Sequence, residues 1–326
     1  MTIDRQPARI RPLVLLLAVW LSVATAVVPA TAQTTALDPR TVYERAAPAV
    51  GVVRITVDGR SGAGTGFVID RAGLMLTAAH VARRADALVV ELPGTRPLPA
   101  SVIGYDARRD VALLRVNSPA PLPAIDVADG ALRAGEPIVV IGAPRGRPGV
   151  MTVGEVVATR ASLPGLVPDT LIVINADVAP GNSGGPVLNA SGQAVGLVIA
   201  RGNDSVGLAV SGSTMLAALP GLRQGARIER PWIGIAGRTA SPEFARERGL
   251  SVDHGGVILE IVPDSPAAAA DLQPGDVIVV MDGRAIASWQ DVLSSVADRE
   301  PGQRVHLTVV RGNARLDAQV TLGVRP

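Results

Sequence analysis

The sequence predicts a mostly β protein with two folded domains behind an N-terminal export segment. Between residues 50 and 210, short apolar stretches rich in β-branched residues are separated by turns at regular spacing. That pattern is typical of an all-β barrel or sandwich. Strands do not alternate with long helices there, so a parallel α/β sheet is not expected. The chain has 326 residues, 48% of them hydrophobic, which is enough for two cores.

Composition narrows the classes of partner and chemistry. All 31 basic residues are arginine, and they are scattered among 29 acidic residues. No basic stripe results, so no nucleic-acid partner is expected. The chain has no cysteine, which excludes disulfides, a thiolate nucleophile and a cysteine-ligated metal. No histidine or carboxylate cluster has metal-ligand spacing, so neither a metal nor a cofactor is expected.

Residues 1–32 have the pattern of an export signal. Arg5, Arg9 and Arg11 precede an apolar run over 13–28, and a small-x-small Ala-Thr-Ala follows at 30–32. The run is shorter than the ~20 residues that comfortably span a bilayer. A cleaved signal peptide is favoured, and a retained N-terminal membrane anchor stays open. In both cases the body of the protein is exported, either periplasmic or held at the inner membrane.

The next segments can be assigned in order along the chain. Residues 33–48 form a linker with a brief helix over 38–46, which Asp38 caps, Pro39 begins and Pro48 ends. The first domain covers 49–222. Its clearest predicted strands are 50–57, 64–70, 87–92, 110–116, 136–144, 150–160, 169–178, 186–200 and 205–210.

A short helix and a charged stretch over 212–231 break this rhythm and predict a domain boundary, with the linker at 223–230. The second domain, 231–326, is a compact module of mixed strands and two helices. Strand-like stretches are 232–237, 256–262, 275–283 and 304–313, and the helices are an Ala-rich one after Ser265 and another over 288–299.

Ser183 lies between glycines in Ala-Pro-Gly-Asn-Ser-Gly-Gly-Pro, residues 179–186. A hydroxyl needs a base to become a nucleophile, and histidine is the usual one. His80 ends the apolar strand Leu-Thr-Ala-Ala-His. Asp110 opens another apolar strand, which would carry its carboxylate inside, where an imidazole N–H is a suitable donor. The order His80, Asp110, Ser183 is that of the chymotrypsin triad.

The glycines around Ser183 suit acyl transfer. The backbone N–H groups of Gly181 and Ser183 could stabilise the oxyanion that forms at the attacked carbonyl. Gly181 turns its N–H inward without a Cβ in the way, and Gly184 and Gly185 let the chain pass closely beneath the nucleophile.

Each piece has an ordinary structural alternative. The Gly-Asn-Ser-Gly-Gly run is also typical of a glycine-rich turn, and Asp106 competes with Asp110 for the same role. His254 and His306 are interpreted as surface or strand residues. The Gly62–Gly66 glycines lack dinucleotide-motif spacing and are interpreted as a turn that begins a strand. Three motifs in one order within one β-rich domain favour serine catalysis.

At this point the chain resembles the HtrA/Deg family of exported serine proteases, over nearly everything after the signal. The matching blocks are Gly-Thr-Gly-Phe-Val-Ile-Asp, Leu-Thr-Ala-Ala-His-Val, Asp-Val-Ala-Leu-Leu-Arg-Val and Gly-Asn-Ser-Gly-Gly-Pro-Val. The C-terminal part is similar to a single PDZ domain. The resemblance implies a chymotrypsin-like double six-stranded β-barrel followed by an α+β PDZ domain. It assigns Ser183 as nucleophile, His80 as general base and acid, Asp110 as the residue orienting the imidazole, and the N–H groups of Gly181 and Ser183 as the oxyanion hole.

The resemblance also implies substrates and regulation. Unfolded or regulatory proteins would be cleaved after small aliphatic residues, in quality control or an envelope stress response, with the loop at 201–206 lining the specificity pocket. The backbone around Trp232, Ile233, Gly234 and Ile235 would hold a C-terminal peptide beside helix 288–299, and the bound peptide would modulate activity. Arg160 lies near the position of a relaying arginine in relatives.

Two departures from the family pattern bear on assembly. Residues 58–64 form a much shorter segment than the regulatory loop of some relatives, and only one PDZ copy is present. The simpler branch that this favours forms homotrimers through the N-terminal part of the protease domain, around Tyr43. Two other functions stay open: a catalytically silent peptide-binding or chaperone protein on the same fold, and a non-peptidase serine hydrolase. The latter would carry a strand–turn–helix nucleophile elbow, whereas strands follow Ser183.

Overall fold

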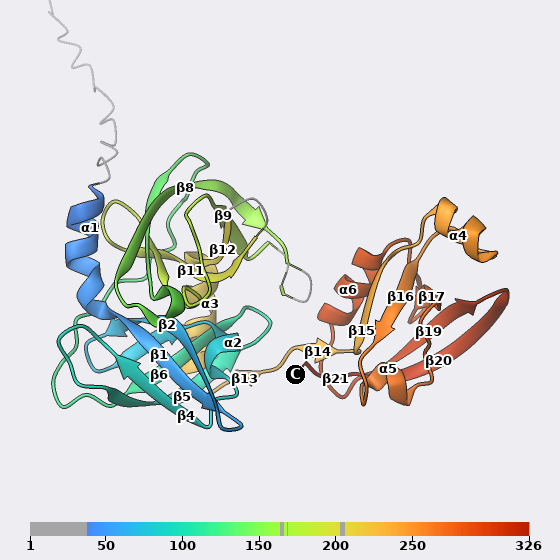
Figure 1. The fold of residues 1–326 in the computed structure, drawn as a ribbon, viewed down its shortest axis with the longest axis horizontal. Helices are drawn as coiled ribbons and strands as arrows, with labels where there is room; N and C mark the ends of the chain where they lie inside the picture. The colour runs from blue at the N-terminus through green and yellow to red at the C-terminus, as the bar shows by residue number, and fades with distance from the viewer. Residues whose placement is uncertain (1–37, 164–165, 168, 203–205, 326) are drawn as a thin grey trace, which may run out of the picture. The chain divides into compact units, whose positions relative to one another are not determined.

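The computed structural model describes residues 38–163, 166–167, 169–202 and 206–325 (Figure 1). The predicted export segment 1–32 and the start of the linker, 33–37, lie outside the described residues. The brief helix that follows is confirmed as α1, Pro39–Ala46, and Asp38 caps it by accepting a hydrogen bond from the backbone N–H of Arg40 at 3.2 Å.

The first β-barrel is a closed antiparallel sheet. Its order is β5-β4-β1-β2-β3-β6, and the pairing of β5 with β6 closes it. The strands are β1 Val50–Val57, β2 Arg60–Asp70, β3 Leu74–Thr77, β4 Ala87–Glu91, β5 Leu98–Asp106 and β6 Val111–Val116.

The second β-barrel is closed in the order β10-β11-β12-β9-β8-β7. Its strands are β7 Pro137–Gly142, β8 Val150–Ala161, β9 Leu171–Ile174, β10 Pro186–Leu188, β11 Ala194–Arg201 and β12 Gly207–Ser211. The predicted double six-stranded barrel is therefore confirmed.

Aliphatic side chains fill both barrels, as a chain with 2% aromatic residues requires. Phe67, Met75 and Leu113 are fully buried in the first barrel, and Ile138 and Ile172 in the second. Alternate residues of each strand point to the barrel interior. The short helices α2 Ala79–Ala82 and α3 Gly212–Arg223 and the 3₁₀ turns Ala47–Ala49 and Pro144–Gly146 connect or cover these strands.

The predicted strands of the barrels differ from the structure in several places. The stretch 186–200 splits into β10 and β11, because the Asn189 carboxamide oxygen accepts hydrogen bonds from the backbone N–H groups of Ser191 and Gln193 and closes a turn. Strand β5 was not among the clearest predicted strands. Gly62–Gly66 do not form a turn: they lie inside β2 and pair with β1.

The C-terminal domain is a mixed module, as predicted, but it has a third helix, α4, that was not predicted, and the predicted strand 232–237 divides into β14 and β15. Its sheet runs β15-β16-β17-β19-β20, with β18 beside β17 and with β15 at an edge, and β14 pairs separately with β21. The strands are β14 Pro231–Trp232, β15 Ile235–Thr239, β16 Gly256–Ile261, β17 Val277–Met281, β18 Arg284–Ala285, β19 Arg304–Arg311, β20 Ala314–Thr321 and β21 Gly323–Val324. The helices are α4 Pro242–Arg248, α5 Pro266–Ala269 and α6 Trp289–Ala297.

The predicted linker 223–230 contains a short strand, β13, Arg227–Ile228. It pairs in parallel with β5, so Arg227 lies beside Tyr105 and Ile228 beside Asp106. This segment is therefore joined to the first barrel by sheet hydrogen bonds.

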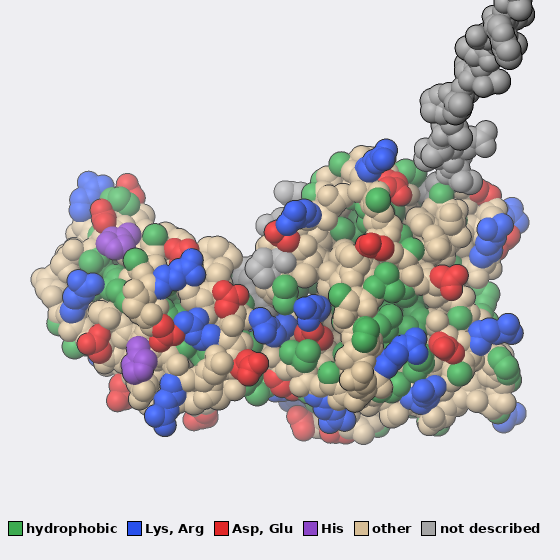
Figure 2. Space-filling view, turned by 180° about the vertical axis from the view of Figure 1, so that it is seen from behind, with side chains coloured by type: hydrophobic (Ala, Val, Ile, Leu, Met, Phe, Trp, Pro, Cys, Tyr) green, Lys and Arg blue, Asp and Glu red, His purple; other side chains and the backbone are tan. Residues whose placement is uncertain are grey.

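Charged side chains of both signs are interspersed on the surface shown in Figure 2. Histidine side chains are visible on the C-terminal domain in this view. His254 and His306 are both exposed, in agreement with their interpretation as surface or strand residues.

Candidate active site

His80 and Asp110 form a direct pair. His80 was predicted at the end of a strand, but it lies in the short helix α2, which begins two residues after β3 ends at Thr77. Its ring Nδ1 lies 2.8 Å from Asp110 Oδ2, and its backbone N–H donates to Asp110 Oδ1 at 2.9 Å. An ionised carboxylate only accepts, so Nδ1 carries the proton and Nε2 is left as an acceptor.

Asp110 is buried, with 6% of its surface exposed. Burial raises the pKa of this carboxyl, but the hydrogen bonds from His80 and the charges of His80 and Arg230 outweigh it, so its pKa lies below the ordinary value. Asp110 is therefore ionised at neutral pH and can hold the imidazole in one orientation.

Asp106, the competing carboxylate, has a structural role. It is 1% exposed and accepts hydrogen bonds from the backbone N–H groups of Arg108 and Arg109, which closes the turn between β5 and β6. The Arg109 guanidinium also pairs with it, at 2.5 Å. Asp106 thus shapes the turn that presents Asp110, and the His80 ring pairs with Asp110.

Ser183 lies in the turn before β10, next to the residues that precede His80. A Cβ on Gly184 would lie 2.4 Å from Thr77 Oγ1 and 3.0 Å from the Ala78 backbone nitrogen. The Ser183 hydroxyl itself donates to the carbonyl oxygen of Ile199 at 3.3 Å. In the described part of the chain it makes no hydrogen bond to His80, and the structure packs the turn of Ser183 against Thr77 and Ala78, just before His80.

The backbone at Gly181 has the form that an oxyanion hole needs. The Pro180 carbonyl accepts a hydrogen bond from the Arg145 backbone N–H at 2.9 Å. The Gly181 N–H of the same trans peptide therefore points the opposite way. Within the described residues, neither the Gly181 nor the Ser183 N–H donates to another backbone group.

Gly181 is required at this position. Its φ is +104°, and a Cβ there would lie 2.4 Å from the Ala143 carbonyl oxygen. Gly184 has φ +90°, and a Cβ there would lie 2.0 Å from the Thr65 carbonyl oxygen. The predicted reason for these glycines, close passage of the backbone, agrees with the geometry.

Arg230 is a residue that the sequence reasoning missed. Its Nε and Nη2 donate to the Ala107 carbonyl at 3.2 and 2.9 Å, three residues before Asp110. Burial lowers the pKa of Arg230, while the charge of Asp110 opposes that shift. His80, Asp110 and Arg230 all line one cavity of about 190 Å³. One sign of this role was present in the sequence, the charged residues over 227–230. An ordinary charged linker has the same composition, so that sign did not distinguish Arg230.

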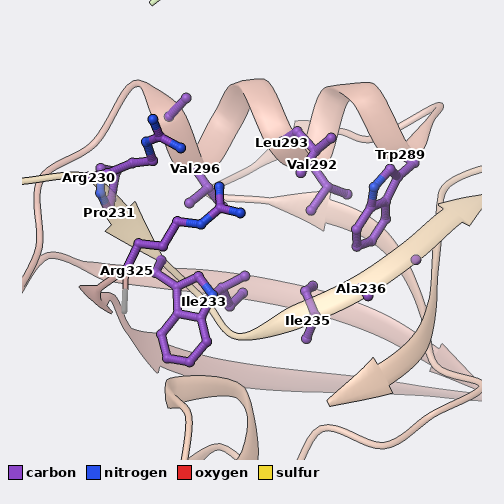
Figure 3. A pocket seen from close by; sticks show the side chains of 13 residues that line it. Arg230, Pro231, Ile233, Ile235, Ala236, Trp289, Val292, Leu293, Val296 and Arg325 are labelled. Carbon is purple, nitrogen blue, oxygen red and sulfur yellow. The ribbon is translucent and has the colours of Figure 1, made fainter. Parts of the chain in front are cut away.

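The C-terminal domain carries an apolar groove between α6 and the free edge of β15 (Figure 3). Its volume is about 380 Å³. The figure places Ile233 and Ile235 on the strand side and Val292, Leu293 and Trp289 on the helix side, with Arg230 and Arg325 at one end. Three of the four predicted peptide-binding residues, Trp232, Ile233 and Ile235, line this groove.

Gly234, the fourth predicted residue, shapes the loop that enters β15. Its φ is +88°, and a Cβ there would lie 2.1 Å from Ser265 Cβ. Its carbonyl accepts from the Val262 backbone N–H at 2.9 Å, and that of Ile233 accepts from Ala267 at 2.8 Å. Both carbonyl oxygens therefore already accept hydrogen bonds from other residues of the C-terminal domain.

Arg160 lies apart from the triad. It sits near the end of β8 with 74% of its side chain exposed and pairs with Asp169 at 2.9 Å. Of the loop 201–206, which was predicted to line a specificity pocket, residues 203–205 lie outside the described residues. In the part of the chain that the structure describes, no group of three His, Asp or Glu could hold a metal ion. No helix of that part is long and apolar enough to cross a membrane.

The first part of the chain has two closed barrels and a His–Asp pair beside a serine in a glycine-rich turn. The second part has a groove at the edge of a strand. Together these features define the class of trypsin-like proteases that carry a peptide-binding domain. The family comparisons agree with this class. Residues 64–197 match the trypsin-like peptidase domain, and residues 231–322 match the PDZ domain.

Named relatives give the family. A probable periplasmic serine endoprotease DegP-like of Pseudomonas fulva is 34% identical over 269 residues, covering 81% of this chain and 56% of the relative. Its counterpart from Brucella suis is 34% identical over 271 residues, covering 81% and 53%. The chain thus spans about half the length of the curated relatives it matches.

Solved structures match over nearly their whole length. The HtrA-type protease AlgW with a tripeptide is 30% identical, with a TM-score of 0.57, covering 89% of this chain and 98% of that one. AlgW with a decapeptide is 26% identical, with a TM-score of 0.60, covering 89% and 99%. This chain belongs to the HtrA family of serine proteases.

Proposed function

We propose that the protein is an exported serine endopeptidase in which Ser183, His80 and Asp110 act as nucleophile, general base and acid, and orienting carboxylate. The observation that carries the proposal is the His80–Asp110 pair, held by two hydrogen bonds beside the turn of Ser183. The N–H groups of Gly181 and Ser183, which donate to no backbone group among the described residues, supply the electrostatic part of the site.

The reaction follows from these positions. Ser183 Oγ leaves the Ile199 carbonyl, transfers its proton to His80 Nε2 and forms a C–O bond with the substrate carbonyl. The electron pair of that carbonyl moves onto its oxygen, facing the two N–H groups. Collapse of this intermediate breaks the peptide bond, and the departing amine takes the proton from His80. Water then repeats the sequence on the acyl-enzyme.

Covalent labelling with a fluorophosphonate tests the proposal. The wild-type chain should be labelled, Ser183→Ala should not, and His80→Ala should be labelled far more slowly. Ser191→Ala, an exposed serine eight residues further on, serves as the control and should label like the wild type. Equal labelling of Ser183→Ala and wild type would exclude Ser183 as the nucleophile.

Cleavage after small aliphatic residues is the proposed specificity, and unfolded or regulatory proteins are the proposed substrates. Both rest on the family resemblance. A digest of denatured casein should show cleavage mainly after Val or Ala. Cleavage mainly after Arg or Phe would contradict the specificity.

The groove of the C-terminal domain is proposed to bind C-terminal peptides that modulate the protease. Arg230 supports this link, because it lines both the groove and the cavity at His80 and Asp110. Decapeptides with a free carboxylate and an apolar last residue should change the labelling rate of Ser183. Their C-terminal amides are the matched control and should not. A role for Arg160 in the relay would make Arg160→Ala insensitive to these peptides.

A catalytically silent peptide-binding or chaperone protein is the second candidate. One observation favours it: the Ser183 hydroxyl donates to Ile199 and not to His80. If the labelling experiment shows no reaction with or without peptides, while the groove still binds them, this function replaces the first.

A periplasmic location is proposed because the relatives are named as periplasmic proteases. N-terminal sequencing of the mature protein would separate a cleaved signal, with a new terminus near residue 33, from a retained inner-membrane tether.

A homotrimer formed through the protease domain is proposed as the assembly. Tyr43 lies on α1, and Met151, Val153 and Val157 on β8 are exposed apolar side chains that such contacts would cover. Light scattering should give three times the chain mass for the wild type and a smaller species for Val153→Arg. A monomeric wild type would contradict the assembly.

A further inference from the structure

Thr65 lies in β2 where this strand of the first barrel passes the nucleophile turn of the second. Its side chain is completely buried. A Cβ on Gly64, the preceding residue, would lie 3.0 Å from the Ser183 carbonyl oxygen. The Gly-Thr-Gly stretch and the Gly-Asn-Ser-Gly-Gly stretch are therefore packed backbone against backbone, with Thr65 as the one side chain larger than hydrogen in the first of them.

Thr65 is fully hydrogen-bonded, and its partners belong to the site. Its hydroxyl donates to the Gly181 carbonyl at 2.6 Å and accepts from the Ala143 backbone N–H at 2.9 Å. Its backbone N–H donates to the Ser183 carbonyl at 2.8 Å. Its own carbonyl accepts from the Thr77 hydroxyl at 2.7 Å. One residue thus contacts both ends of the nucleophile turn and the end of β7.

The hydroxyl contact matters because Gly181 has no Cβ to restrict its backbone. A glycine at φ +104° adopts other conformations at little cost, so its N–H direction has to be fixed from outside. The peptide before Gly181 is fixed at the Pro180 carbonyl by Arg145, and the peptide after it is fixed at the Gly181 carbonyl by Thr65. The Asn182 N–H of that second peptide also donates to the Ala179 carbonyl oxygen at 3.0 Å, so without Thr65 this weaker turn contact alone holds the peptide after Gly181.

We propose that Thr65 is a positioning residue of the oxyanion hole: its hydroxyl holds the Gly181 carbonyl away from the reaction centre and thereby keeps the Gly181 N–H directed at the oxyanion. This inference rests on the proposed serine chemistry. It adds a residue from β2, outside the triad and outside the nucleophile turn, that acts through Gly181.

Thr65→Val tests the proposal, since it keeps the shape and removes the hydroxyl. The limiting rate of Ser183 labelling by a fluorophosphonate at high pH should fall 10- to 100-fold, because the phosphoryl oxygen uses the same N–H groups. Deleting an oxyanion donor outright costs 10²–10³-fold, and misplacing one costs less. The pH midpoint of labelling should not move, because His80 and Asp110 are untouched.

Two further substitutions of Thr65 separate a positioning role of its hydroxyl from a role in packing. Thr65→Ser keeps the hydroxyl and should label within threefold of the wild type. Thr65→Cys has nearly the same shape as serine but a weak donor, and it should label at least tenfold more slowly than Thr65→Ser. This pair keeps the test decisive if Thr65→Val does not fold. Thr214→Val is the matched control: its buried hydroxyl bonds Ser211 and the Thr170 carbonyl, and its loss should leave labelling unchanged.

These experiments separate a failure of the positioning role of Thr65 from a failure of the proposed serine chemistry. If the wild type itself is not labelled, or Ser183→Ala labels equally, the serine chemistry is wrong. If the wild type labels at Ser183 while folded Thr65→Val stays within threefold of it, the positioning role is wrong. Equal rates for Thr65→Cys and Thr65→Ser, or a shifted pH midpoint in Thr65→Val, would overturn it as well.

Discussion

The Arg230 guanidinium donates two hydrogen bonds to the carbonyl oxygen of Ala107, at 3.2 and 2.9 Å, in the turn that presents Asp110. A residue of the segment between the two domains therefore holds the turn that leads to Asp110, the partner of His80. Glu229 adds to this contact by pairing with Arg83 at 3.2 Å and bonding the Tyr105 hydroxyl.

Replacing Arg230 by Met should destabilise the protease domain and slow Ser183 labelling. A hydrogen bond from a charged group contributes about 1.5–3 kcal/mol, and the Ala107 carbonyl would lose both of its bonds from Arg230. Urea unfolding of the full chain measures the loss. Arg227→Met is the control, because that arginine lies three residues earlier in the same linker segment and is exposed. If both variants unfold at the same urea concentration, the guanidinium does not hold the turn.

Gly184→Ala should be far more damaging than Gly192→Ala, although both glycines have positive φ. Left-handed backbone costs an alanine about 1–2 kcal/mol in either place. At Gly184 the new Cβ would also lie 2.0 Å from the Thr65 carbonyl oxygen, and such overpacking adds about 1–3 kcal/mol. A Cβ added at Gly192 would have no atom of the described residues within 4 Å, apart from those of its neighbours in the chain. Thermal melting of the two variants should differ accordingly, and equal melting temperatures would contradict the packing.

Leu293→Glu should abolish peptide binding at the groove without slowing the protease. The leucine lines the groove on α6, so a carboxylate there removes apolar contact and repels the terminal carboxylate of a peptide. Fluorescence anisotropy with a labelled decapeptide should show at least tenfold weaker binding. Gln290→Glu, exposed on the same helix, should bind like the wild type. Undiminished binding to Leu293→Glu would place the peptide elsewhere.

Asp291→Asn should destabilise α6 only above about pH 4. Hydrogen bonding with Ser288 holds the pKa of Asp291 below its ordinary value of 3.8, with the N–H groups of Ala287 and Ser288 assisting. A carboxyl whose pKa is lowered by folding stabilises the fold above its unfolded pKa, and that contribution is lost as the pH falls through the folded pKa.

Helix caps of this kind contribute about 0.5–2 kcal/mol. Urea unfolding at pH 7 should therefore show a gap of this size between wild type and Asp291→Asn. The gap should narrow progressively below pH 3.8. A gap that stays constant down to pH 3 would mean that the charge of Asp291 is not what stabilises the helix.

Much of this architecture could be predicted from sequence because local patterns determine it. Turn residues and β-branched runs indicated most strands of both barrels, and Asp38 with Pro39 indicated the first turn of α1. The pairing of Asp110 with His80 followed from an aspartate at the start of a buried strand, which needs a donor. Membership of the family came from the order of whole motifs.

What the sequence did not indicate depends on contacts between distant segments. Gly62–Gly66 looked like a turn because glycine is typical of turns. Gly64 lacks a side chain because the Ser183 carbonyl, more than a hundred residues away in sequence, packs against it, and Gly66 lies against Met75 and Val53. Arg230 and Thr65 escaped notice for the same reason: their partners, Ala107 and Gly181, are fixed only by the tertiary fold.

Strand β13 has a consequence for where the chain can be cut. It covers the outer edge of β5, where the backbone N–H groups of Tyr105 and Ala107 donate to Ala226 and Ile228. A proteolytic nick at Gln224 would free that edge and leave a strand open to pairing with a neighbouring molecule. A nick after Pro231 would leave the edge sealed. We therefore expect the smallest monomeric proteolytic fragment that keeps both barrels to end beyond Arg230, and not at the end of α3, Arg223.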